Sequence, residues 1–186
     1  MNWGLKEKKV GYISSHKREI PPYYLSNLNS NNMKNVMFAF GGLGIKINYD
    51  LFNKWSEYRF LVPSHFNHKN FSKAPYNVFF FDKSIRVLDL LPYCSRIITK
   101  PGFSTFCEAL TYDVGIHSVD REGFVESEEL IKGLRKYGLN NILSKIDFNN
   151  GNWELDQELT SPTDNKLSID GATRAAKEIV GFVLTS

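Results

Sequence analysis

Two hydroxyl side chains and a carboxylate follow a Pro-Gly turn in residues 98–110, ITKPGFSTFCEAL. The stretch begins as an apolar, β-branched run, breaks at Lys100-Pro101-Gly102, and resumes with a helical pattern. A helix N-terminus has unpaired N–H donors and a partial positive charge that suit a phosphate, and Ser104 and Thr105 can add hydroxyl donors. Glu108 lies four residues after Ser104 on the same face, where a carboxylate can accept hydrogen bonds from a ribose diol. The same pattern also fits plain helix capping, and the sequence leaves both interpretations open.

Apolar runs alternate with helical patterns along most of the chain. The runs at residues 36–40, 59–63, 78–82, 96–100 and 114–119 are continuous, which is typical of strands buried on both faces of a parallel sheet. The intervening segments include amphipathic patterns at residues 103–113 and 124–139, and a terminal helix is expected within residues 168–184. This alternation predicts an α/β fold with a Rossmann-like, doubly wound parallel sheet. Beyond residue 140 we expect irregular structure with one short strand, and a short helix at residues 153–159.

Three loops fall on one edge of this predicted sheet, because ligands and loops gather at the carboxyl ends of parallel strands. The first loop contains Gly41, Gly42 and Gly44, which would let the backbone approach a ligand closely. The second follows the third strand at Phe81 and Asp82. The third is the turn at Lys100 and Gly102. The sequence therefore predicts one anion-binding site shared by these loops.

Composition restricts the class of protein. The chain has 186 residues with a net charge of +3, which fits one domain and offers no strongly basic surface for nucleic acid. We interpret residues 1–35 as a linker or N-terminal extension, with a short strand at residues 10–14, and residues 36–186 as the ligand-binding domain. Cys94 and Cys107 fit no zinc or CxxC pattern, so we expect reduced, buried cysteines in a cytoplasmic protein. No apolar run is long enough to predict a transmembrane helix.

Residues 90–130, LLPYCSRIITKPGFSTFCEALTYDVGIHSVDREGFVESEEL, resemble the C-terminal, donor-binding half of GT-B glycosyltransferases. They are most similar to the MurG-like group, of the family 28 C-terminal type, and they also resemble the glycosyltransferase-like domain of plant arabinokinases. The matching signature is K-P-G-F-S-T, a Glu that opens E-A-L, a strand, and D-R-E-G-F-V-E. VMFAFGGLG matches the family's glycine loop, and NGNW resembles the arabinokinase version. The resemblance covers residues 36–155 and implies a single GT-B half-domain.

The resemblance implies roles for individual residues. The glycine loop would face a diphosphate, the start of the predicted helix would hold a phosphate, and Glu108 would bind the ribose hydroxyls. The backbone near the end of the third strand would read uracil, and the D-R-E-G-F-V-E segment would lie near the donor sugar. The residues implied to bind the donor are Gly41, Gly42, Gly44, Phe81, Asp82, Lys100, Gly102, Ser104, Thr105, Glu108, Arg121 and Glu126. The chain departs from the family at Gly115, where a Pro is usual, and at Asp120, where Arg is common.

The implied function is the donor-binding half of a hexosyltransferase that uses a UDP-sugar such as UDP-N-acetylglucosamine. Its acceptor would be held by a missing N-terminal domain or by a separate subunit, which would also supply the general base, so no catalytic residue is expected in this chain. An exposed apolar patch should mark where that domain docks, and the assembled enzyme would be peripheral at a membrane. No DxD-type sequence follows a strand, so we expect no metal and no cofactor besides the donor. The alternatives are a non-catalytic nucleotide-sugar-binding domain and a degenerate domain.

Overall fold

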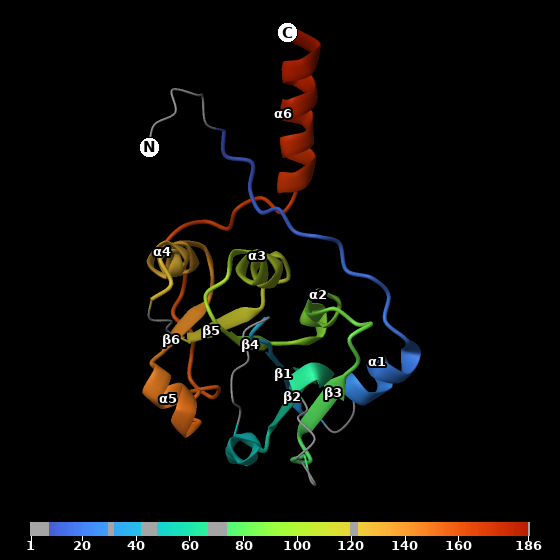
Figure 1. Cartoon of the computed structure of the whole chain (residues 1–186), viewed down its shortest axis with the longest axis vertical. Coiled ribbons are helices and arrows are strands. Elements are labelled where there is room, and N and C mark those ends of the chain that lie inside the picture. The colour runs from blue at the N-terminus through green and yellow to red at the C-terminus, as the bar shows by residue number, and fades with distance from the viewer. Residues whose placement is uncertain (1–7, 30–31, 42–47, 67–73, 120–122, 186) are drawn as a thin grey trace.

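A six-stranded, all-parallel sheet forms the centre of the molecule. The computed structural model describes residues 8–29, 32–41, 48–66, 74–119 and 123–185. The strands are β1 (Lys34–Phe38), β2 (Tyr58–Pro63), β3 (Val78–Phe81), β4 (Arg96–Thr99), β5 (Gly115–Val119) and β6 (Asn140–Leu143). Their spatial order is β3-β2-β1-β4-β5-β6, as Figure 1 shows. The predicted Rossmann-like, doubly wound fold is confirmed, and the sixth strand lies where one short strand was expected.

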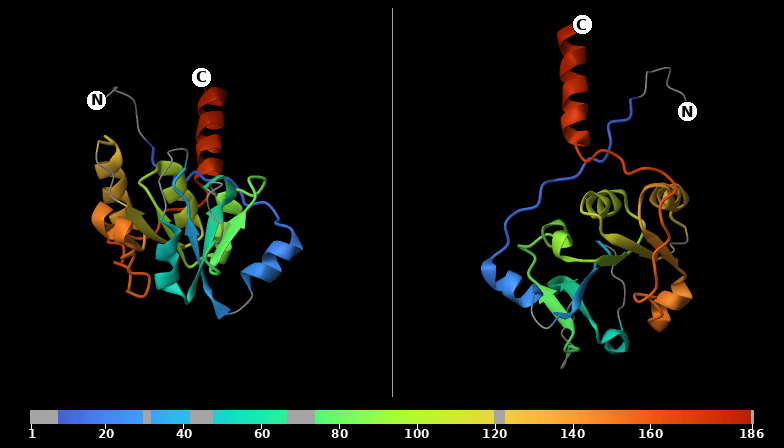
Figure 2. Two further views of the ribbon diagram at one scale, coloured as in Figure 1. Left: turned by 60° about the horizontal axis from the view of Figure 1, so that its bottom comes forward. Right: turned by 180° about the vertical axis from the view of Figure 1, so that it is seen from behind.

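Helices cover both faces of the sheet, giving three layers (Figures 1 and 2). One face carries the helices from the later crossovers, and the opposite face carries shorter elements. The first set is α2 (Val87–Leu90), continued by η4 (Leu91–Tyr93), with α3 (Phe103–Thr111) and α4 (Ser127–Tyr137). The second set is η2 (Tyr49–Trp55) and α5 (Lys145–Asn150). The remaining elements are α1 (Pro22–Leu28), η3 (Ser64–Phe66) and α6 (Gly171–Thr185).

Neighbouring residues of the central strands point into different cores, because side chains alternate across a strand. Met37 of β1 pairs with Ile97 of β4, and both belong to the core beneath α2, α3 and α4. Val36, Phe38 and Ile98 belong to the core on the opposite face. The continuous apolar runs therefore reflect burial on both faces of the sheet.

Trp153 is the centre of the second core. Its side chain is 1% exposed, and its ring centroid lies 5.7 Å from that of Phe38, 5.1 Å from Phe52 and 5.4 Å from Phe60. Its indole N–H donates to the Phe148 carbonyl at 3.0 Å. The short helix expected at residues 153–159 is wrong. Glu154 has a positive φ of 53°, outside the helical region, and the chain instead turns Trp153 into the core.

The N-terminal segment packs on the domain. Tyr12, Ile20, Tyr24 and Leu28 are buried in the same core as α2, α3 and α4. The strand expected at residues 10–14 is wrong, because Gly11 has a φ of +95°, outside the β region, and the segment crosses the chain near Ser168. The Tyr12 N–H donates to the Ser168 carbonyl at 2.8 Å at this crossing.

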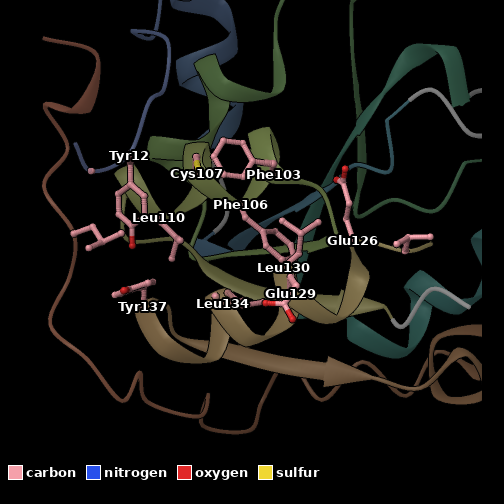
Figure 3. Close-up of a pocket in the computed structure, with 14 residues that line it drawn as sticks. Tyr12, Phe103, Phe106, Cys107, Leu110, Glu126, Glu129, Leu130, Leu134 and Tyr137 are labelled. Carbon is pink, nitrogen blue, oxygen red and sulfur yellow. The ribbon is translucent and has the colours of Figure 1, made fainter. Parts of the chain in front are cut away.

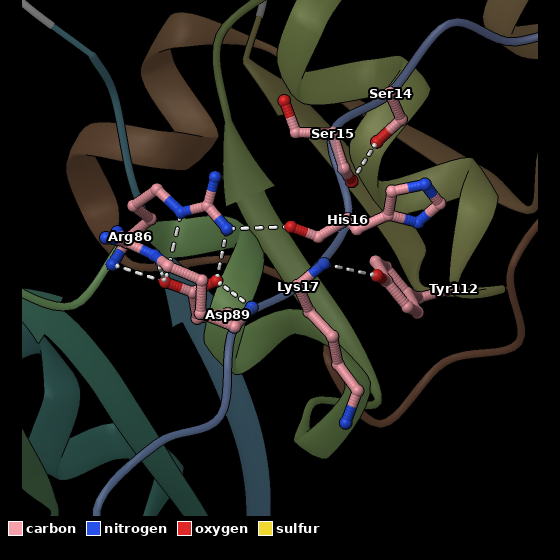
Figure 4. Close-up of polar contacts among 8 residues, drawn as sticks. Ser14, Ser15, His16, Lys17, Arg86, Asp89 and Tyr112 are labelled. Atoms are coloured by element: carbon pink, nitrogen blue, oxygen red, sulfur yellow. Dashed lines mark hydrogen bonds and ion pairs between the residues drawn. The ribbon is translucent and has the colours of Figure 1, made fainter. Parts of the chain in front are cut away.

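A buried carboxylate, Asp89, fixes the middle of the N-terminal segment (Figure 4). Its oxygens accept from the Arg18 backbone N–H at 2.7 Å and from Arg86 Nη2 at 2.6 Å. The same Arg86 Nη2 also donates to the His16 carbonyl at 2.8 Å. These charged contacts hold the pKa of the Asp89 carboxyl at about 2, although burial alone would raise it. Asp89 thus joins residues 16–18 to the start of α2.

The two terminal segments cross so closely at Gly171 that a side chain has no room there. A Cβ there would lie 2.3 Å from the Tyr12 carbonyl oxygen, a backbone atom that cannot rotate away. We expect Gly171→Ala to lower the free energy of unfolding by about 1–3 kcal/mol through overpacking. Urea denaturation followed by circular dichroism measures this change.

Gly133 in α4 is the matched control, since a Cβ there meets nothing within 4 Å. We expect Gly133→Ala to raise the free energy of unfolding by about 0.5–1 kcal/mol, because Ala favours a helix interior over Gly. Equal effects of the two substitutions would show that the crossing at Gly171 is not tight.

Helix α6 extends away from the body of the molecule in every view (Figures 1 and 2). The predicted terminal helix is confirmed, but its apolar side does not pack on the sheet. Ile179, Val180, Val183 and Leu184 are all exposed, Leu184 by 80%. None of the described helices is long and apolar enough to cross a membrane. Exposure of these apolar side chains of α6 to water is energetically unfavourable.

Candidate functional site

The turns after β1 and β4 meet at the switch point of the sheet, where successive connections leave in opposite directions. Gly41 follows β1, and Lys100 follows β4. A Cβ built on Gly41 would lie 3.8 Å from Lys100 Cε and 3.9 Å from its Nζ. The structure therefore brings together the first and third predicted loops. Gly42, Gly44 and Arg121 lie outside the described residues, as does Asp120.

Helix α3 begins at the same place. Its N-cap is Gly102, and within the described chain no side chain caps the helix. The first helical hydrogen bond runs from the Phe106 N–H to the Gly102 carbonyl at 3.0 Å. The amides of the preceding turn therefore have no acceptor within the helix. Ser104 is exposed and Thr105 half-buried in that turn. Helix capping therefore does not account for the two hydroxyls.

Glu108 lies one turn further along α3 and is half-buried. Burial raises the pKa of its carboxyl, Arg86 opposes this, and Asp89 adds to it. A carboxyl with a raised pKa close to a cation and another carboxylate is a candidate for ligand binding. Sequence reasoning missed Arg86, although its spacing of three residues from Asp89 at a helix start was a usable signal.

Phe81 and Asp82 lie apart from this cluster. They follow β3, at the edge of the sheet and three strands from β4, or about 14 Å at ordinary strand spacing. Phe81 is buried in the core. The Asp82 N–H donates to the Tyr24 hydroxyl at 3.2 Å, and its carboxylate accepts from the Ser84 N–H at 2.8 Å. The backbone amide at this strand end thus has a partner within the protein.

Glu126 also lies apart from Ser104 and Glu108. It is the exposed N-cap residue of α4, on the rim of a cavity between α3 and α4. Figure 3 shows it at one end of that cavity. The cavity is lined from α3 by Phe103, Phe106, Cys107 and Leu110. Ser104 and Glu108 do not line it, and each lies about 100° around the helix from its neighbour Phe103 or Cys107.

Cys94 and Cys107 are free, and Cys107 is buried, while Cys94 is half-buried. Burial raises the pKa of both thiols. A thiol with a raised pKa is a poor nucleophile at neutral pH, so neither residue has the properties of a reactive cysteine.

No protein-family model matches the sequence, and no curated protein matches it. Solved structures do match its fold. The glycosyltransferase SnogD from Streptomyces nogalater superposes with a TM-score of 0.55 at 19% identity, over 80% of this chain and 38% of that one. The glycosyltransferase VinC in complex with DTDP gives 0.55 at 18% identity, over 73% and 35%. UGT2 from Phytolacca americana gives 0.53 at 16% identity, over 92% and 42%.

These proteins are longer than this chain, which spans about two fifths of their length. At such low identity the superpositions establish the fold and leave the ligand open. The superpositions extend over 73–92% of this chain and over one part of each longer protein. The chain has the α/β, Rossmann-like fold of a GT-B glycosyltransferase half-domain.

Proposed function

We propose that this chain is the donor-binding half of a glycosyltransferase and binds a UDP-sugar similar to UDP-N-acetylglucosamine. The observation that carries the proposal is the meeting of Gly41, Lys100 and the uncapped start of α3 at the switch point. Backbone N–H groups and a lysine converge there, as a diphosphate requires. The MurG-like sequence signature at residues 100–105 supports the same assignment.

Each group has a defined task in this proposal. The amides of the first turn of α3, with the hydroxyls of Ser104 and Thr105, hold a phosphate and stabilise the negative charge that develops on the leaving diphosphate. Glu108 accepts hydrogen bonds from the ribose diol. Such stabilisation needs no metal. Gly42, Gly44, Arg121 and Glu126 complete the donor site by resemblance.

We further propose that an acceptor-binding domain or subunit completes the enzyme. The chain spans about two fifths of the glycosyltransferases that share its fold. Ile179, Val180 and Val183 on the exposed side of α6 form the apolar surface on which that part would dock. The acceptor part would supply the general base, so the isolated chain would bind the donor without turning it over.

Calorimetric titration of the purified chain with UDP, UDP-N-acetylglucosamine and dTDP tests the donor assignment. dTDP is included because one structure with the same fold is described in complex with it. We expect Glu108→Ala to weaken binding of UDP by about ten- to a hundredfold, since a carboxylate hydrogen bond contributes about 1.5–3 kcal/mol.

The control is Glu128→Ala, which removes an exposed carboxylate on α4 and should leave affinity unchanged. Tighter binding of dTDP than of UDP would mean that the site prefers thymine to uracil. The location of the proposed site would stay the same. No binding by the folded chain at millimolar ligand, or binding that Glu108→Ala leaves intact, would refute the proposed site and favour a degenerate domain.

A further inference from the structure

The cavity between α3 and α4 is a second candidate site, and the donor assignment uses only Glu126 of its lining residues. Its volume is about 600 Å³, within the range of small-molecule sites. Phe106, Cys107 and Leu110 of α3 form one wall, and Leu130 and Leu134 of α4 form the other (Figure 3). An apolar lining of this kind favours an apolar ligand.

Tyr12 closes one end of the cavity. The residue is 5% exposed, and its hydroxyl makes no hydrogen bond of good geometry among the described residues, although the Leu167 backbone N–H approaches its oxygen. The O–H donor therefore lacks an acceptor. Leaving such a group buried and unpaired costs about 1–3 kcal/mol, which a ligand carrying one oxygen atom would recover. Burial raises the pKa of this hydroxyl, with a smaller opposing effect of the Leu167 backbone, so it stays protonated and able to donate.

The hydroxyl oxygen itself is buried, so access to it from the cavity requires a small movement. Leu167 also lines this end, is only partly buried, and belongs to a segment without helix or strand. Its side chain can therefore shift without disturbing the sheet or the helices. The ligand's oxygen would then take the place that Leu167 now covers.

The opposite end of the cavity is acidic. Glu126 and Glu129 lie on the rim there, and Lys132 pairs with Glu129 at 2.9 Å. Glu126 therefore adds negative charge at this end. This negative charge disfavours fatty acids and other anionic amphiphiles. An amphipathic helix from another protein fits less well, because its backbone groups bond internally and bring nothing to Tyr12.

We infer that the cavity between α3 and α4 binds an uncharged, mainly apolar small molecule that ends in one hydroxyl or carbonyl group, with that group at Tyr12. The cavity differs from the proposed donor site and shares only Glu126 with it, since Ser104 and Glu108 do not line the cavity. Ring systems and aliphatic chains share this chemistry, and two pairs of probes distinguish them.

The first pair is naphthol and naphthalene, which differ by one hydroxyl, and the second is octanol and octanoate, which differ in charge. Titration of the full chain should give binding of naphthol about tenfold tighter than of naphthalene, the effect of one buried hydrogen bond. Tyr12→Phe should abolish this difference. Octanol should bind at least tenfold tighter than octanoate, and the tighter of naphthol and octanol identifies a ring or a chain as the preferred body.

Gly133→Phe provides a blocking variant that should still fold. Gly133 lines the cavity, and a Cβ there meets nothing within 4 Å, so a phenyl ring can occupy the cavity without displacing its walls. We expect this variant to lose naphthol binding and to keep its circular dichroism spectrum. Binding that survives Gly133→Phe, or equal affinity of the native chain for naphthol and naphthalene, would overturn the inference. So would self-association of the chain that Gly133→Phe abolishes, since the cavity would then be a protein interface.

Discussion

Replacing Trp153 with alanine should cost the protein about 3–5 kcal/mol of unfolding free energy, more than any other single truncation proposed for this chain. The indole is 1% exposed and lies among the rings of Phe38, Phe52, Phe60 and Phe148. Its removal leaves a cavity that these rings, which come from β1, η2, β2 and α5, cannot fill together. It also leaves the Phe148 carbonyl without its indole donor.

The measurement is chemical denaturation of Trp153→Ala beside Trp55→Ala. Trp55 also donates its indole N–H to a carbonyl, that of Gly151 at 2.9 Å, but it is only partly buried. We expect Trp55→Ala to lose less than half as much stability. A loss at Trp153 smaller than that at Trp55 would mean that the second core is not organised around this side chain.

His117 should cause the protein to lose stability on acidification at pH values well above those at which carboxylates usually take up protons. The ring is fully buried in β5, and its Nε2 lies 3.1 Å from Arg96 Nη1. Because a guanidinium can only donate, Nε2 accepts, and we assign the ring proton to Nδ1. Burial, followed by the charge of Arg96, lowers the pKa of His117 to about 4, with the Trp153 backbone opposing.

The lowered pKa sets the direction of the effect. Between pH about 6.5 and about 4 the unfolded chain binds a proton at this histidine and the folded chain does not. Acidification therefore favours unfolding across this interval, and stability rises again as pH is raised. A shift of this size corresponds to about 3 kcal/mol.

Denaturation curves at several pH values between these limits measure the effect in the native chain and in His117→Gln, whose amide can still accept from Arg96. We expect the native chain to lose about 3 kcal/mol more than the variant on acidification. The exposed His16 provides the control, and His16→Gln should follow the native curve. Parallel curves for the native chain and His117→Gln would show that the buried ring titrates normally.

The central fold was predictable because burial on both faces leaves a continuous apolar run. The runs at residues 36–40 and 96–100 predicted β1 and β4, and the rule for parallel sheets predicted that Gly41 and Lys100 lie on one edge. β6 was harder to predict, since Asn140 and Asn141 leave only two apolar residues in it. β3 is also an edge strand, but all four of its residues are apolar, so its run was visible.

Contacts between distant parts of the chain were not predictable from local patterns. Nothing in the spacing of residues 16–18 indicates that Arg18 meets Asp89. The helical pattern of α6 was visible, but a pattern does not reveal whether its apolar side has a partner. Which residues of α3 line the cavity, as Phe106 does, and which do not, as Ser104 does not, could be known only once the helix was placed between its neighbours.

The contact between the two terminal segments bears on how the protein is made. Tyr12 is synthesised well before its backbone partner Ser168 and before Leu167, which lines the cavity beside it. The central strand β1 likewise waits for β4 before its second edge is paired. Until Leu167 and Ser168 are synthesised, Tyr12 lacks its native contacts with them. Chaperones bind exposed apolar segments of a nascent chain during such a period.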